Sequence, residues 1–191
     1  MTNGPSDESL FLKYRADGDL EAFGRLYDRY GPAVFRFLVR LLHDRAAAED
    51  LVQHVFLRVH ESRAAFDPRR SFRTWIFTIA RRLAVNWAAR TGGAATETDP
   101  PDLEDEAPSP EHRAIVRDEA RALERALSSL SREDAEVLLL ARYEGLSYEE
   151  IGEVVGCTSD AAKMRVHRAL KRLAERLPES PRRTARPLKG V

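Results

Sequence analysis

Lysine and arginine side chains gather near the C-terminal end of this chain, in numbers suited to binding the phosphates of a nucleic acid. Between Cys157 and Val191 there are ten Lys or Arg residues against three Asp or Glu residues, a local balance of 10 − 3 = +7. A basic helix with short side chains at its start can enter the major groove of duplex DNA. The candidate groove-facing residues are Ser159, Asp160, Lys163, Met164, Arg165, His167, Arg168 and Lys171.

The residues before and within this basic stretch predict a helix-turn-helix. Ser147 and Glu150 have the spacing of a capping box, which marks the start of the first helix. Gly152 is small where we expect the crossing helix to come close, and Gly156 stands where the chain leaves the helix with a positive φ. Ser159 is expected to cap the second helix. Turn spacing, caps and charge agree, which favours a DNA-reading motif over an ordinary helical hairpin with a solvated basic face.

A second cationic cluster lies between Phe66 and Arg90, where six arginines oppose only Asp67, a balance of 6 − 1 = +5. A basic surface beside a loop can hold the backbone of a separated DNA strand while an unstacked base enters a pocket. Phe72 and Trp75 could stack on bases. They lie on an apolar stripe at helical spacing, however, which favours a place in the core.

A third set of polar residues belongs to a predicted helix after Asp44. Asp50 and Gln53 are three residues apart and share one face, where they can hydrogen-bond to a basic partner helix. Asp50 and His54 are four apart and could share a metal ion, with His60 nearby. No third ligand at a suitable spacing completes a site, so the sequence disfavours a metalloenzyme or hydrolase and predicts no cofactor.

The elements that carry these residues all show helical periodicity. Residues 6–91 form a first lobe, in which Asp19, Asp44 and Ser71 are expected to cap helices and Gly31-Pro32 to break and restart one. Residues 113–177 form a second helical lobe, in which Ser131 is a further cap. No stretch alternates with the two-residue period of a strand. The sequence therefore predicts an all-α protein of two small helical domains.

Between the lobes, residues 92–112 carry seven acidic side chains and no Lys or Arg, and they are rich in Pro and Gly. This composition predicts a flexible acidic linker. Residues 178–191 predict a basic disordered tail. The chain of 191 residues has one cysteine, no apolar run of membrane-spanning length and no secretory signal pattern, so we expect a cytoplasmic location.

Three stretches in this order closely resemble the extracytoplasmic-function (ECF) subfamily of the bacterial sigma-70 factors. They are DRAAAEDLVQHVFLRV at residues 44–59, FDPRRSFRTWIFTIARRLAVNW at residues 66–87 and LSSLSREDAEVLLLARYEGLSYEEIGEVVG at residues 127–156. The resemblance extends from about Leu20 to Leu173. It implies a region 2-like domain and a region 4-like domain. It also implies a factor without catalytic chemistry that directs core RNA polymerase to the promoters of a specific regulon and helps to open them.

The resemblance assigns a role to each set of residues. Glu49, Asp50, Gln53 and His54 would dock on core polymerase, whose β′ and β subunits are the implied partners. The promoter −10 element would be captured by Asp67, Arg69, Arg70, Ser71, Arg73, Arg81, Arg82 and Asn86. The basic helix would read the −35 element. An anti-sigma factor is a further implied partner, and the linker could either mimic RNA in the polymerase channel or act as a plain tether.

An autonomous helix-turn-helix repressor or activator is the alternative function. It would explain the second lobe, but it would leave the basic loop and the long linker without a role. A helix-turn-helix by itself does not separate these two classes of protein.

Overall fold

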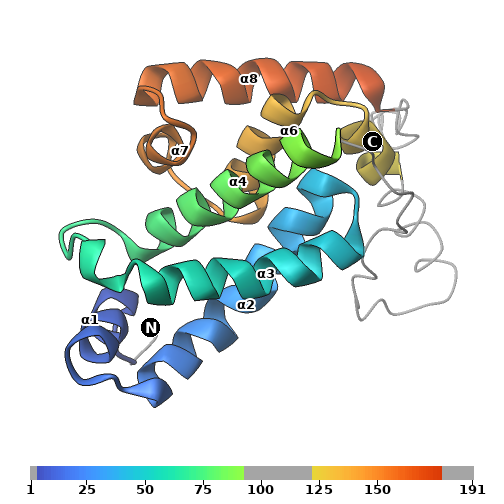
Figure 1. Cartoon of the computed structure of the whole chain (residues 1–191). Coiled ribbons are helices and arrows are strands. Elements are labelled where there is room, and N and C mark those ends of the chain that lie inside the picture. Colours follow the sequence, from blue (N-terminus) through green and yellow to red (C-terminus); the bar gives the residue numbers. More distant parts are fainter. Residues whose placement is uncertain (1–3, 93–121, 178–191) are drawn as a thin grey trace, which may run out of the picture.

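The computed structural model describes residues 4–92 and 122–177, and every regular element within these ranges is helical (Figure 1). The first lobe contains α1 (Asp7–Asp17), α2 (Leu20–Leu42), α3 (Arg45–Glu61), the short 3-10 turn η1 (Arg63–Ala65) and α4 (Phe72–Thr91). The second lobe contains helical residues 122–128, α6 (Arg132–Leu138), the π-helical turn η2 (Leu139–Tyr143), α7 (Tyr148–Val155) and α8 (Ser159–Arg176). The predicted all-α class is confirmed. The predicted linker, apart from Gly92, and the predicted tail lie outside the described residues.

Side-chain caps begin the long helices where the sequence predicts them. The carboxylate of Asp19 accepts hydrogen bonds from the backbone N–H groups of Glu21 and Ala22, both at 3.0 Å. Asp44 and Ser71 cap α3 and α4 in the same way, and Ser131 caps α6. Each cap satisfies a first-turn donor that has no partner inside its helix, which contributes about 1 kcal/mol.

The predicted break at Gly31-Pro32 is wrong, because α2 runs without interruption from Leu20 to Leu42. Proline inside a helix removes one backbone hydrogen bond and costs about 3 kcal/mol. Leu26 before the proline and Val34 after it are both fully buried. Burial of the apolar stripe on both sides of Pro32 outweighs the local cost, and the proline itself lies on the exposed side of the helix.

Helix α1 was not predicted as a separate element. Ser6 caps its start, accepting a hydrogen bond from the backbone N–H of Ser9 at 3.2 Å, and Gly18 ends it with a φ of 67°. Leu10, Phe11 and Tyr14 are its buried residues. In Figure 1 the helix lies at the far end of the first lobe from α8, against α2 and beside the start of α4.

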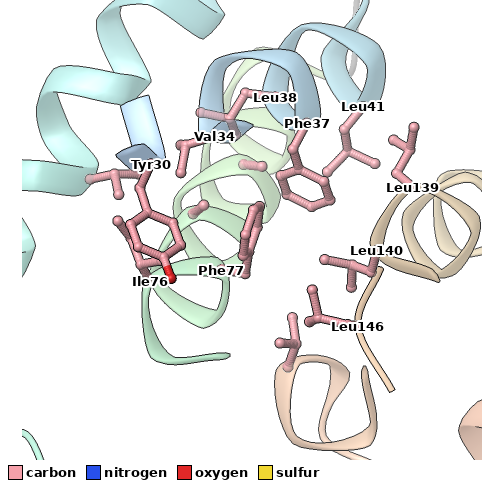
Figure 2. Packing of buried hydrophobic residues seen from close by; sticks show 14 of the residues in the cluster. Tyr30, Val34, Phe37, Leu38, Leu41, Ile76, Phe77, Leu139, Leu140 and Leu146 are labelled. Carbon is pink, nitrogen blue, oxygen red and sulfur yellow. The ribbon is translucent and has the colours of Figure 1, made fainter. Parts of the chain in front are cut away.

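The two lobes share one apolar core rather than standing apart. Helices α2, α3 and α4 pack together, and α4 also packs along α7 of the second lobe. Figure 2 shows the seam, where Leu140 and Leu146 face Phe37 and Phe77. Phe37 and Phe77 contact each other edge to face, with ring centroids 5.5 Å apart. Burial of each such side chain contributes about 1.5–3 kcal/mol, so the lobes hold each other in this arrangement.

A buried arginine adds polar contacts to the same seam. Arg40 of α2 is 4% exposed, and its Nε lies 3.0 Å from Oε1 of Glu124 in the second lobe. The guanidinium group also stacks over the ring of Tyr143, 4.4 Å from the ring centre. Buried charge is costly unless it is paired, so the contact with Glu124 offsets part of the cost of burying Arg40 at this seam.

Candidate nucleic-acid and protein interfaces

The helix-turn-helix consists of α7, a tight turn and α8. The predicted capping box is present, because the backbone N–H of Glu150 donates to Oγ of Ser147 while the Glu150 carboxylate accepts from the Ser147 N–H. Gly156 ends α7 with a φ of 76°, as predicted. The cap of α8 is Thr158 rather than Ser159, and its Oγ1 accepts from the backbone N–H of Ala161 at 3.2 Å. Both residues are competent caps, so the sequence pattern is ambiguous by one position.

Gly152 is required by the turn and also by the start of the crossing helix, as the sequence predicted, because an added Cβ would lie 3.4 Å from the backbone nitrogen of Ser159, the first residue of α8. A Cβ atom at this position would lie 2.6 Å from the backbone carbonyl oxygen of Cys157. The turn between α7 and α8 is closed by hydrogen bonds from the N–H groups of Gly156 and Cys157 to the carbonyl oxygen of Gly152, both 2.8 Å. The half-buried Cys157 packs against the core. The turn therefore sets the angle of α8 through backbone contacts that only glycine permits.

Helix α8 has one buried face and one exposed face. Ala162, Val166 and Ala169 are buried against the rest of the second lobe, whereas Leu170 is at the margin and 36% exposed. All the residues predicted to face a DNA groove are exposed: Ser159, Asp160, Lys163, Met164, Arg165, His167, Arg168 and Lys171. Met164 has 56% of its surface exposed and stands among cationic neighbours. The helix therefore presents a continuous cationic face with one apolar side chain in it.

The loop of residues 67–71 is a compact turn closed by Asp67. Its carboxylate accepts from the backbone N–H of Arg69 at 3.0 Å and pairs with the Arg69 guanidinium, and the N–H of Arg70 donates to the Asp67 carbonyl. The backbone hydrogen bond from Arg69, followed by its side-chain hydrogen bond, lowers the pKa of Asp67. Asp67 therefore shapes the loop and stays ionised, while the Arg69 side chain is 90% exposed.

The predicted −10 residues on and beside α4 are not equally accessible. Arg82 and Asn86 are exposed, and Arg73 is half-buried. Arg70 Nη2 lies 2.7 Å from Oε2 of Glu153 on α7. Part of this cationic surface is therefore already paired with the other lobe.

A more deeply buried ion pair joins α4 to α6. Arg81 Nε lies 2.6 Å from Oε1 of Glu136, whose side chain is 5% exposed. Burial raises the pKa of the Glu136 carboxyl, and the Arg81 charge acts in the opposite direction. Thr74 Oγ1 also donates to Oε1 of Glu150 at 3.4 Å. The second lobe thus brings two carboxylates to α4 and a third to Arg70 in the loop before it. The sequence did not predict this pattern, because the partners are more than fifty residues apart.

The outer face of α3 carries the residues predicted to dock on a protein partner. Glu49, Asp50, Gln53 and His54 are all exposed. Glu49 pairs with Arg45 at 3.0 Å, and His54 Nδ1 lies 3.3 Å from Oδ2 of Asp50. As predicted for core positions, Leu51 and Phe56 are buried.

Leu57 belongs to the same outer face and was missed by the sequence analysis. It follows Asp50 by seven residues and Gln53 by four, and 51% of its surface is exposed. Spacing at i, i+3, i+4 and i+7 from Asp50 was the signal that could have found it.

Phe72 and Trp75 are core residues, as the sequence favoured. Phe72 is fully buried, and Trp75 is half-buried against it with ring centroids 5.9 Å apart.

Residues 4–92 and 122–177 contain neither a metal-binding group nor a membrane-spanning helix. No three His, Cys, Asp or Glu side chains come together there in a group that could hold a metal ion. Nor does any helix in these ranges combine the length and the apolar content that crossing a membrane requires.

Comparisons with known proteins match both lobes and most of the chain. Residues 26–93 match the model of the family described as Sigma-70 region 2, and residues 120–173 match that of Sigma-70, region 4. RNA polymerase sigma factor CarQ of Myxococcus xanthus is 35% identical over 89% of this chain and 97% of its own length. ECF RNA polymerase sigma factor SigX of Bacillus subtilis is 28% identical over 82% of this chain and 84% of its own length.

Solved structures share the arrangement of helices. CnrH, solved in complex with the cytosolic domain of CnrY, superposes with a TM-score of 0.66 at 25% identity, over 90% of this chain and 96% of that one. The sigma factor RpoE of Bartonella quintana, solved with the anti-sigma factor NepR, gives a TM-score of 0.67 at 24% identity, over 86% of this chain and 98% of that one. The helix-turn-helix, the region 2 and region 4 matches and the full-length similarity to CarQ lead to one conclusion: the chain belongs to the ECF subfamily of the sigma-70 family, whose members are transcription initiation factors and not enzymes.

Proposed function

We propose that this protein docks on core RNA polymerase through α3, reads a −35 element with α8, and captures an opened −10 element with residues 67–71 and α4. It would thereby direct initiation at one specific set of promoters. The observation that carries this proposal is the orientation of α8, whose predicted groove-facing residues are all exposed while its opposite face is buried in the second lobe.

The face of α8 has the chemistry of a major-groove reader. Most of its Lys and Arg side chains would hold phosphates, which position the protein without reading sequence. One or two of them, with Arg165 and Arg168 as the candidates, would pair with the acceptor edge of guanine. Met164 offers an apolar contact suited to a thymine methyl group, and its 56% exposure leaves it available for that contact.

The loop and α4 have the chemistry of a strand-capture surface. Arg69 at the loop and Arg82 on α4 are exposed cations that can hold the backbone of a separated strand. Bases held outside the stack in this way offset the stacking and pairing lost when the duplex opens. Arg70 and Arg81 can join this surface when a phosphate replaces the carboxylates of Glu153 and Glu136.

The outer face of α3 has the mixed character of a protein-docking surface. Asp50 and Gln53 offer acceptors to a basic partner helix, and the β′ and β subunits of the polymerase are the proposed partners. Leu57 adds an exposed apolar side chain at the same face, which gives the contact a group to bury. We further infer an anti-sigma factor as a regulatory partner, supported by the RpoE–NepR complex among the structural relatives.

The test is co-elution of the purified full-length protein with bacterial core RNA polymerase, together with its binding to duplex DNA alone. The proposal predicts stoichiometric co-elution and weak duplex binding in the absence of core. An autonomous repressor or activator would do the opposite, ignoring core and binding a duplex site by itself. That result would overturn the roles proposed for α3 and for residues 67–71.

A further inference from the structure

Helix α1 contacts both ends of the loop that precedes α4. Arg15 Nη1 donates a hydrogen bond to the backbone carbonyl oxygen of Phe66 at 2.9 Å, just before the loop. The backbone N–H of Phe72, just after the loop, donates to Oε1 of Glu8 at 3.0 Å. Glu8 and Arg15 are seven residues apart on one helix and therefore lie on the same face. Helix α1 therefore hydrogen-bonds to the residues on both sides of the loop formed by residues 67–71.

The contact of Glu8 supplies what the local sequence of α4 lacks. The first-turn N–H groups of a helix have no partner inside it, and Ser71 satisfies only that of Thr74. Glu8 satisfies the N–H of Phe72 from a distant part of the chain. Its negative charge at the N-terminus of α4 is also favourable to the helix dipole. Where α4 begins, and hence where the loop ends, therefore depends on α1.

An aromatic cluster in the core also connects α1 to both ends of the loop. The ring of Phe11, which is fully buried, lies 5.0 Å from the ring of Phe66 and 5.0 Å from that of Phe72. It also lies 5.2 Å from the ring of Trp75. These contacts between the α1 core residue and both ends of the loop leave little freedom for one end to move relative to the other.

The geometry points to α1 as the positioning element of the −10 loop: we propose that Glu8 and Arg15 fix its two ends so that Arg69 and its neighbours are presented in one conformation. This inference rests on the function proposed above for residues 67–71. The region 2 match begins at residue 26, so α1 lies outside it. Neither side chain is proposed to touch DNA; both act through the loop backbone.

The experiment uses the full-length chain bound to core polymerase. Bound DNA is selected from a duplex library with a fixed −35 element and randomised −10 positions, and the enrichment of the preferred −10 sequence is measured. The test variants are Glu8→Ala and Arg15→Ala. The rescue variant is Glu8→Gln, whose amide oxygen can still accept from the Phe72 N–H. The matched controls are Asp17→Ala and Lys13→Ala, which remove the same charges from exposed positions of α1.

We expect each test variant to lower the −10 enrichment about fivefold, the fold-change that corresponds to one lost hydrogen bond. Glu8→Gln and both controls should retain the wild-type enrichment. Core co-elution and a thermal unfolding midpoint close to wild type, measured on the same samples, show that the variants are folded and docked.

Unchanged −10 enrichment in folded Glu8→Ala and Arg15→Ala would overturn the inference and leave the proposed function intact. Equal losses of core co-elution and of −10 enrichment would also overturn it, because they would indicate a merely structural role for α1. A wild-type holoenzyme that selects no −10 sequence at all would instead overturn the proposed function, and the inference with it.

Discussion

Two cationic surfaces of this protein are built in different ways. On α8 the basic residues stand on one exposed face, and the angle of the helix is set within the second lobe by the Gly152 turn. On α4 the surface is shaped by distant parts of the chain. Glu8 of α1 holds the start of the helix, and Glu136 of the second lobe pairs with an arginine on it. Glu153 of the second lobe pairs with Arg70 in the loop before it.

The difference bears on how each surface would meet nucleic acid. A duplex that reaches the predicted groove-facing residues of α8 meets exposed side chains and releases their counterions, whereas Arg172 on the same helix already pairs with Asp134 of α6. A strand that reaches Arg70 and Arg81 has to exchange its phosphates for carboxylates that are already bound. The same residue type can therefore contribute differently to affinity on the two surfaces, and variants can measure the difference.

The largest effect is expected on the exposed surface. Replacing both Arg165 and Arg168 by Ala should lower −35-dependent transcription by roughly a hundredfold, because two phosphate or base contacts would be lost. Core co-elution should stay at the wild-type level. Arg176→Ala, on the last turn of the same helix, is the matched control and should have little effect in the same run-off transcription assay. Loss of core binding in the double variant would contradict the division of roles between the lobes.

The next effect tests how α8 is held in place. Gly152→Ala puts a Cβ atom 2.6 Å from the Cys157 carbonyl oxygen, so the turn must shift. We expect a loss of about 2 kcal/mol or more in the free energy of unfolding, measured by chemical denaturation. Gly24→Ala is the matched control, since its added Cβ would meet no atom within 4 Å beyond its chain neighbours and the helix's own backbone, and helix propensity predicts a gain of about 0.5–1 kcal/mol. Equal responses of the two variants would show that the turn does not set α8.

A third prediction concerns α3, which neither DNA surface uses. Replacing Asp50 and Gln53 by Ala should weaken core binding about tenfold, the loss expected for two hydrogen bonds to a partner. DNA selection at the −35 element should not change once core is added in excess. Arg25→Ala, an exposed ion-paired residue of α2, is the control for the affinity measurement. Unaltered core affinity in the double variant would remove α3 from the docking surface.

The smallest effect is expected at the ion pair between Arg70, in the loop before α4, and Glu153 of the second lobe. Glu153→Gln frees Arg70 from an exposed ion pair, so single-strand binding by the holoenzyme should rise about twofold and the gain should fade at high salt. Glu175→Gln removes the same charge from an exposed position of α8 and controls for general electrostatics. Arg70→Ala should abolish the gain. If Glu175→Gln raises binding equally, the pairing of Arg70 with Glu153 has no specific effect.

Local signals in the sequence predicted much of the candidate site. Asp19, Asp44, Ser71 and the Ser147–Glu150 box were found because a cap depends only on residues within one turn of it. The exposed residues of α8 followed from the 100° step between successive side chains. The same local reasoning was ambiguous between Thr158 and Ser159, and it was wrong at Pro32, where burial on both sides overrode the propensity of one residue.

The sequence by itself determined the all-α class, the helix-turn-helix and the residues that α8 exposes, because each depends on neighbours within a few positions along the chain. Only the tertiary structure decided that α1 holds the loop before α4, that Glu136 and Glu153 reach the arginines of the first lobe, and that the two lobes share one core. The physical reason is sequence separation. Contacts between residues fifty or more positions apart depend on how whole helices pack, and no local pattern of residue types records that packing.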